Sequence, residues 1–236
     1  MSVESANSND LSLRQVAATF GLRETREDPA WESDFSTWLK SARTREQLVE
    51  MFGQFRSGES AFDSLMRRVI MRSLCKSVGS DLQVASSVVL KHPETMEFGN
   101  SVFIGSQTMI QGRFDGNCRI GNHVWIGPQA YFDARDLVLE DYVGWGPGAK
   151  VLGSTHTAQP VSMPIITTEL VIKPVRIGFG ADIGMNASIL PGVQIGAHSI
   201  VGTGSVVTRD VPEYAIVAGA PAKILRFRNE EEIRHV

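Results

Sequence analysis

Residues 176–207 read RIGFGADIGMNASILPGVQIGAHSIVGTGSVV, and a branched apolar residue recurs there at every sixth position. Small or apolar residues stand four positions after each of them, and glycine often follows directly. A period of six fits neither an α-helix nor a plain strand, whose side chains repeat every 3.6 and two residues. It predicts a solenoid of triangular coils, in which the branched residues stack inward. These residues are Ile177, Ile183, Ile189, Ile195, Val201 and Val207.

The same phase continues toward the N-terminus with interruptions. A ten-residue step after Ile110 and a seven-residue step after Phe132 predict small outward bulges. The 26-residue step from Val151 to Ile177 predicts a protruding loop at residues 155–173. We therefore expect a mostly β fold of about five to six coils, each supported by its neighbours. The inward positions of this earlier part are Phe98, Ile104, Ile110, Ile120, Ile126, Phe132, Leu139, Trp145 and Val151.

The first part of the chain has a different composition. Four of the 22 glycines precede residue 81, and nine of the ten prolines follow Lys91. This predicts an α-helical N-terminal region at 1–80, followed by a solenoid domain at 81–236 that ends in a C-terminal tail. Ser/Thr-x-x-Gln capping boxes at Ser12 and Thr44 mark expected helix starts. The first ten residues are expected to be disordered.

An amphipathic helix is the clearest element of the N-terminal region. Six apolar residues form one stripe at helical spacing, namely Phe62, Leu65, Met66, Val69, Ile70 and Leu74. The opposite face carries Arg67, Arg68, Arg72 and Lys76. We expect a solvated helix face; contact with a membrane surface or an anionic substrate is the alternative.

Composition excludes several functional classes. The 23 Lys and Arg against 26 Asp and Glu give a net charge of −3, which offers no footprint for nucleic acid. The two cysteines, Cys75 and Cys118, lie outside any CxxC pair and are expected to be ordinary reduced thiols. The chain shows neither a signal sequence nor a run of about 18 apolar residues. A cytoplasmic protein without an integral membrane segment is expected.

Two longer motifs are more specific than the hexads. The run from Lys173 to Arg228, which contains the ending VAGAPAK, and the segment GPGAKVLGSTHT at 146–157 resemble the hexapeptide-repeat acyltransferases. The similar branch contains the maltose and galactoside O-acetyltransferases, the capsular-sugar O-acetyltransferases and the xenobiotic acetyltransferases. The resemblance implies a left-handed β-helix, against the usual handedness of crossovers. It also implies acetyl-CoA as donor, a sugar or glycan hydroxyl as acceptor, no metal, and a homotrimer with sites between subunits.

Transfer of an acetyl group to a hydroxyl needs a base, which histidine supplies well. Spacing alone makes His156 an exposed loop histidine, whereas the resemblance places the general base there, acting in direct attack without an acyl-enzyme. Asp133 and Asp136 lie about one coil upstream, and Gln129 stands near a site amide of the family; each is equally compatible with an ordinary turn residue. Trp145 either walls the acceptor pocket or belongs to the core.

The resemblance also assigns a coenzyme site to the C-terminal coils. Backbone groups of Gly184, Ala187, Gly202 and Ser205 are expected along the pantetheine arm, and Lys223 and Arg226 near the phosphates, unless these two form a solvated basic terminus. Asp182 departs from the tryptophan that many maltose-type members carry, which changes the shape of the acyl end.

Other functions compatible with a hexad solenoid were weighed against sugar O-acetylation. A carbonic anhydrase of the gamma class uses two histidines five residues apart, and the sequence contains no such pair. Acylation of a xenobiotic or of a nucleotide-amino-sugar is an alternative within the family. A non-catalytic scaffold, in which His156 is incidental, is the alternative outside it.

Overall fold

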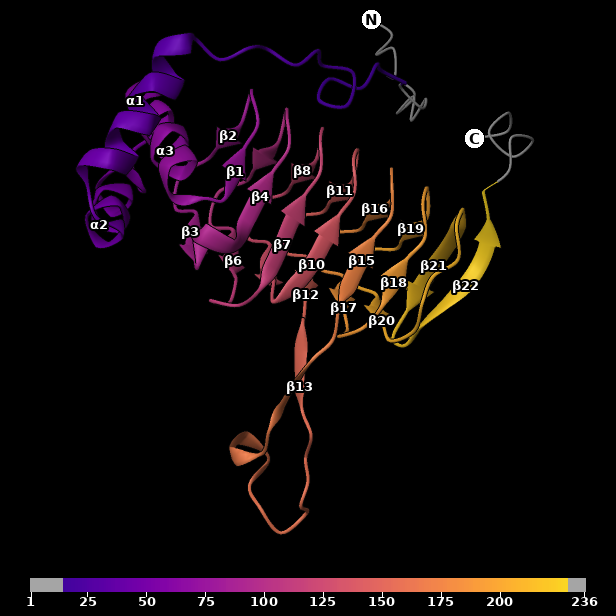
Figure 1. The fold of residues 1–236 in the computed structure, drawn as a ribbon. Coiled ribbons are helices and arrows are strands. Elements are labelled where there is room, and N and C mark those ends of the chain that lie inside the picture. Colours follow the sequence, from indigo (N-terminus) through magenta and orange to yellow (C-terminus); the bar gives the residue numbers. More distant parts are fainter. Residues whose placement is uncertain (1–14, 229–236) are drawn as a thin grey trace, which may run out of the picture.

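A computed structural model describes residues 15–228, which form a three-faced β-helix with three helices at one end (Figure 1). A β-hairpin projects from the side of the β-helix. The helices are α1 (Ala30–Ala42), α2 (Arg45–Phe55) and α3 (Ala61–Leu74). The predicted β-helix with a helical N-terminal region is confirmed.

Each complete coil contributes one strand to each of three parallel sheets, which we call the first, second and third faces. The first face contains β1 (Ser77–Val78), β4 (Met96–Phe98), β7 (Asn117–Ile120), β10 (Asp136–Leu139), β15 (Val175–Ile177) and β18 (Gln194–Ile195). The second contains β2 (Gln83–Val84), β5 (Phe103–Ile104), β8 (Trp125–Ile126), β11 (Gly144–Trp145), β16 (Asp182–Ile183), β19 (Ile200–Val201), β21 (Ala215–Gly219) and the antiparallel β22 (Ala222–Phe227). The third contains β3 (Val89–Lys91), β6 (Met109–Gln111), β9 (Tyr131–Asp133), β12 (Lys150–Val151), β17 (Ser188–Ile189) and β20 (Val206–Val207).

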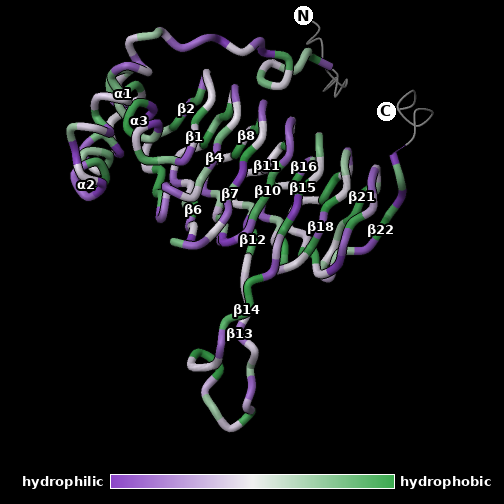
Figure 2. Tube along the Cα trace, viewed as in Figure 1, coloured by the Kyte–Doolittle hydropathy of each residue, from purple (hydrophilic) through white to green (hydrophobic). Residues whose placement is uncertain are grey.

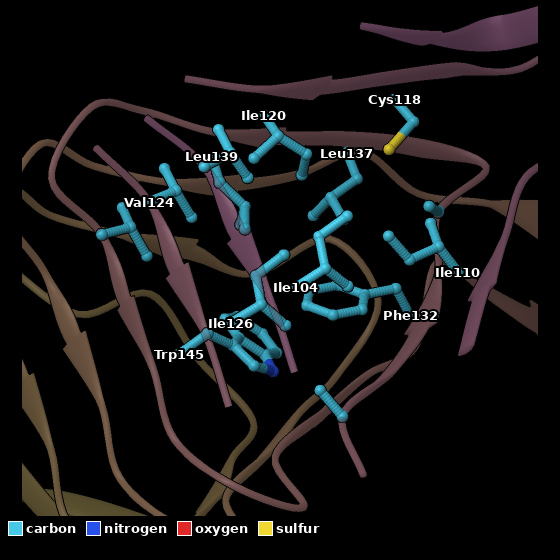
Figure 3. Packing of buried hydrophobic residues seen from close by; sticks show 14 of the residues in the cluster. Ile104, Ile110, Cys118, Ile120, Val124, Ile126, Phe132, Leu137, Leu139 and Trp145 are labelled. Carbon is cyan, nitrogen blue, oxygen red and sulfur yellow. The ribbon is translucent and has the colours of Figure 1, made fainter. Parts of the chain in front are cut away.

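Coil-to-coil register follows the hexad phase. Ile177 pairs with Ile195, Ile183 with Val201, and Ile189 with Val207, so each inward residue stacks on its counterpart one coil away. All six side chains are at most 2% exposed, as are Ile126 and Phe132 in earlier coils (Figure 3). Hydrophobic residues recur along the coils (Figure 2). The predicted inward positions are therefore confirmed.

The three corners of the triangle differ in what they carry. The corner between the third and first faces holds every break in the hexad spacing, including the 3₁₀ turn η1 (Pro93–Thr95), residues 112–116 and the hairpin. We call it the insertion corner. The sequence predicted the two bulges and the long loop. Their position on one corner follows from the phase, because each break falls after a strand of the third face.

The corner between the first and second faces carries a ladder of rings. His123 stacks on Tyr142 with ring centroids 4.7 Å apart, and His198 stacks on Tyr214 at 5.1 Å. Phe179 joins the two pairs, at 5.5 Å from Tyr142 and 5.2 Å from His198. Both histidines occupy turns with positive φ, and their rings are half-buried in this ladder.

The helices begin where the sequence supplies caps. Thr44 and Gln47 form the predicted capping box of α2, in which each side chain accepts a hydrogen bond from the other residue's backbone N–H. A second box, formed by Ser60 and Asp63, starts α3. Ser12 lies outside the described residues, and Gln15 begins an irregular segment that leads to α1.

The three arginines on the basic face of α3 are not solvated, contrary to the sequence-based expectation, whereas Lys76 just beyond the helix is exposed as expected. Arg67 is 2% exposed and donates to the backbone oxygens of Val84, Phe55 and Gly58 at 3.0, 2.7 and 2.6 Å. Arg68 pairs with Glu32 of α1 at 2.7 Å, and Arg72 pairs with Asp28. These arginines hold the helices on the first coil, because α1 and the irregular segment before it pack over the face that sequence alone leaves open.

Candidate functional site

The segment that leaves the insertion corner after β12 begins as a β-hairpin. β13 (Ser154–His156) pairs antiparallel with β14 (Leu170–Ile172), and His156 lies opposite Leu170. The turn between them contains the 3₁₀ helix η2 (Ile165–Thr167). His156 is thereby placed on a paired strand at the root of a projecting arm.

The imidazole of His156 is oriented by the backbone of the returning strand. Its Nδ1 lies 2.9 Å from the backbone oxygen of Thr168, which is itself only 8% exposed. A carbonyl oxygen can only accept, so Nδ1 carries the hydrogen and Nε2 of the neutral ring keeps its lone pair. This is the tautomer that a base acting through Nε2 requires.

Asp133 holds the root of the hairpin. Its carboxylate is 6% exposed and accepts hydrogen bonds from Ser154 Oγ at 2.9 Å, the Gly153 N–H at 3.2 Å and Arg135 Nε at 2.8 Å. Asp133 thus contacts Ser154, which lies two positions before His156 in the sequence. The group that orients the His156 ring is the Thr168 carbonyl.

The other two polar candidates lie elsewhere on the coil. Asp136 is the first residue of strand β10 on the first face, and it pairs with Arg176 at 2.7 Å. Gln129 lies at the corner between the second and third faces, where its side chain donates to Gln107 at 2.9 Å. Within one chain, Gln129 is therefore separated from His156 by the width of the third face.

Trp145 does not line a pocket, and its expected substrate contact is corrected to a core role. Its side chain is 0% exposed, and its ring lies 4.7 Å from that of Phe132 inside the β-helix (Figure 3). Its Nε1 donates to the Ala149 oxygen at 3.1 Å. Trp145 occupies an inward position of the hexad repeat, and the side chains at these positions form the core of the β-helix.

The residues expected along the pantetheine arm stack at the same corner as Gln129. Ala187 and Ser205 are 0% exposed, and the backbone N–H groups of all four bond within the β-helix. A Cβ on Gly184 would lie 2.6 Å from the Thr203 nitrogen, and one on Gly202 would lie 2.9 Å from Ala218 Cβ. Coil-to-coil contact therefore accounts for these small residues.

The side chains that reach solvent at that corner belong to neighbouring residues. Met185 is 47% exposed, and Asn186 and Thr203 are also exposed. Lys223 and Arg226 lie exposed on β22, at the end where the coils finish. Ala187 and Ser205 thus occupy buried positions of this corner, whereas Met185, Asn186 and Thr203 reach solvent there.

Other side-chain chemistry is sparse in the described residues. Burial raises the pKa of the Cys118 thiol to about 12 and that of Cys75 further, so both are protonated. Residues 15–228 contain no group of three His, Cys, Asp or Glu residues arranged to hold a metal ion. No helix in that range is long and apolar enough to cross a membrane.

Comparisons with known proteins agree with this geometry. The model of the bacterial transferase hexapeptide family (six repeats) matches residues 174–209. The galactoside O-acetyltransferase of Lactococcus lactis is 30% identical over 156 residues, which cover 62% of this chain and 73% of that protein. The chain belongs to the hexapeptide-repeat acetyltransferases of the galactoside O-acetyltransferase type.

A second sequence relative and a solved structure are also similar to this chain. A probable acetyltransferase of Mycobacterium tuberculosis is 32% identical over 141 residues, or 56% of this chain, and the chain spans only 44% of its length. A hexapeptide-repeat acetyltransferase from Vibrio cholerae, solved with acetyl coenzyme A, superposes with a TM-score of 0.58 at 25% identity. That match covers 79% of this chain and 87% of the Vibrio chain.

Proposed function

We propose that this protein transfers an acetyl group from acetyl-CoA to a hydroxyl of a sugar or glycan precursor, with His156 as general base. The hydrogen bond from His156 Nδ1 to the Thr168 oxygen carries the proposal, because it leaves Nε2 unprotonated in the neutral ring. Family membership and the coenzyme-bound Vibrio cholerae structure support the reaction class.

In the proposed reaction, Nε2 of His156 takes the proton of the acceptor hydroxyl, and the hydroxyl oxygen forms a bond to the acetyl carbon. Acetyl-CoA supplies that carbon as a thioester, whose carbon–sulfur bond breaks. His156 then returns the proton to the departing sulfur, so the ring ends the cycle neutral. Asp133 is a positioning residue, because it fixes the strand that carries His156 and does not contact the ring.

The coenzyme is proposed to lie along the corner that carries Met185, Asn186 and Thr203, and to end near Lys223 and Arg226. Exposed polar and flexible apolar side chains at this corner suit the amide-containing pantetheine arm, and the two cations suit phosphates. In one chain, this corner and His156 lie on opposite sides of the third face. A complete site therefore needs the His156 corner of one copy against the coenzyme corner of another.

We propose a homotrimer for this reason, with the hairpin reaching the neighbouring copy. The hairpin tip exposes apolar side chains that nothing in the described chain covers, with Val161 at 86%, Ile166 at 80% and Ile165 at 61% exposure. Hydrophobic and polar residues alternate along this arm (Figure 2). Replacement of Ile166 by Asp is expected to shift sedimentation from trimer toward monomer.

The test is thiol release from acetyl-CoA in the presence of pooled galactosides, other sugars, nucleotide-sugars and acetylatable antibiotics. His156→Ala is expected to lower acceptor-dependent release by about 10² or more, the scale for losing a general base. His92→Ala is the matched control, because His92 is a half-exposed histidine whose ring hydrogen-bonds to Glu94 and lies beside Phe114. Equal loss in both variants, or none in His156→Ala, would remove His156 from the mechanism.

A further inference from the structure

A basic pocket lies where the helices meet the β-helix. It has a volume of about 260 Å³. Its rim carries four cationic side chains, Lys40, Arg43, Arg45 and Lys76, and one carboxylate, Glu94. Its floor includes the buried residues Leu48 and Cys75. The cations come from three places: the end of α1, the start of α2 and the residue that follows the α3 C-cap.

Internal ion pairs neutralise only part of this charge. Arg45 binds Glu94 at 2.8 Å, and Lys76 binds Glu97 at 2.6 Å. Lys40 and Arg43 make no salt bridge with any described residue; Arg43 lies over the Trp38 ring at 5.7 Å and donates to the Ala42 oxygen. Two uncompensated cations above a buried floor favour an anion with several oxygen acceptors, such as a phosphate.

The first turn of α2 adds to the same field. Thr44 caps this 11-residue helix, and its box binds the N–H groups of Thr44 and Gln47. The partial positive charge of the helix start adds to the charges of Arg43 and Arg45 on either side of Thr44, while the carboxylate of Glu46 in the first turn offsets part of this charge.

The pocket shares the insertion corner with the hairpin. Glu94 belongs to η1, the first insertion, and the hairpin leaves the same corner three coils later. At about 4.8 Å per coil, the corner runs about 14 Å between them. The intervening coils present Arg113 and Arg135 at this corner. Arg113 and Arg135, each paired with a carboxylate, therefore lie along the corner between the pocket and the hairpin that carries His156.

We propose that the basic pocket binds the phosphate or diphosphate of an anionic acceptor, whose sugar end reaches the His156 corner. This inference rests on the proposed acetyl transfer for the acceptor's role, but binding of the anion can be measured without it. The phosphates of the donor, coenzyme A, are the alternative ligand for the same pocket. Stabilisation of the α1 C-terminus by Lys40 and Arg43 is the reading that needs no ligand.

The experiment is calorimetry on the full chain with sodium pyrophosphate, uridine diphosphate and coenzyme A as separate probes. The double variant Lys40→Gln/Arg43→Gln is expected to weaken pyrophosphate and uridine diphosphate binding by about tenfold or more, because charge-assisted bonds are lost. Arg26→Gln/Arg56→Gln, which removes two exposed cations away from the pocket, is expected to leave both affinities unchanged. Equal affinities in the three proteins, or no binding to the wild type, would overturn the proposal.

The titration with coenzyme A distinguishes an acceptor phosphate from a donor phosphate, and it separates the anion site from the proposed acetyl transfer. Unchanged coenzyme A affinity in Lys40→Gln/Arg43→Gln supports an acceptor site, and a matching loss would assign the pocket to the donor and overturn it. Thiol release then reports on function. Pyrophosphate binding that depends on Lys40 and Arg43, in a protein that neither binds coenzyme A nor releases thiol, would reject the acetyltransferase while keeping the anion site.

Discussion

The carboxylate of Asp133 accepts a hydrogen bond from Ser154 Oγ at 2.9 Å and so joins one coil to the first residue of the hairpin in the next. Asp133→Ala leaves the Gly153 N–H and the Arg135 guanidinium without this buried acceptor. We expect a loss of about 1–3 kcal/mol in local stability, faster proteolysis within residues 157–172 and roughly tenfold lower thiol release. Limited proteolysis and thiol-release kinetics check this.

Asp210→Ala is the control for that prediction. Asp210 accepts one hydrogen bond, from the Gln194 N–H at 2.9 Å, and is exposed at a coil without a hairpin. We expect hairpin cleavage at the wild-type rate in this variant. Equal protection of the hairpin in Asp133→Ala and Asp210→Ala would contradict the role given to Asp133.

Arg67 joins the helices to the first coil through three backbone oxygens. Arg67→Met keeps much of the side-chain volume but leaves those acceptors without a donor in a buried place, so we expect about 2 kcal/mol lower stability in chemical unfolding. Arg56→Met changes the same residue type at an exposed position and is expected to have little effect. A wild-type unfolding midpoint for Arg67→Met would show that the three hydrogen bonds of Arg67 do not hold the helices on the first coil.

The sequence predicts what local periodicity encodes. Ile177 to Val207 reveal the coil, and the break after Val151 reveals the arm that carries His156, because a hexad repeat specifies its neighbours directly. The contact between His156 and Thr168 could not be predicted, because the antiparallel return strand of the hairpin does not follow the hexad repeat. Arg67 was misassigned because helical spacing shows which residues share a face, but not what packs against it.

Gly184 tests whether the small residues of the C-terminal coils serve packing or a ligand. A Cβ there would lie 2.6 Å from both the Thr203 nitrogen and the Val201 oxygen, so Gly184→Ala must push two coils apart. We expect a loss of about 1–3 kcal/mol, the usual cost of overpacking, with coenzyme A affinity unchanged in the folded fraction. Gly21→Ala, where a Cβ meets nothing within 4 Å, is the control. Full stability with lost coenzyme affinity would restore the ligand role.

Asp182 is expected to lower the stability of the folded protein in a pH-dependent way. Burial raises the pKa of its carboxyl above the ordinary 3.8, and the positive charge of Arg228 opposes this only in part. The residue is exposed overall, but its Oδ1 lies over the space that a Gly144 Cβ would occupy, so one side of the carboxylate is shielded from water. A pKa that is higher in the folded state costs no stability below pH 3.8. It lowers stability once the pH rises through the folded value.

Asp182→Asn removes the titrating charge and is therefore expected to raise the melting temperature at pH 7. The gain should shrink as the pH falls toward the ordinary 3.8 of a free carboxyl, because wild-type Asp182 then takes up its proton in the folded protein. Melting curves of both proteins between pH 4 and pH 8 check this, with Asp34→Asn on the exposed side of α1 as the control. A pH-independent gain would mean that the amide packs better, and a loss at pH 7 would mean that attraction to Arg228 outweighs burial.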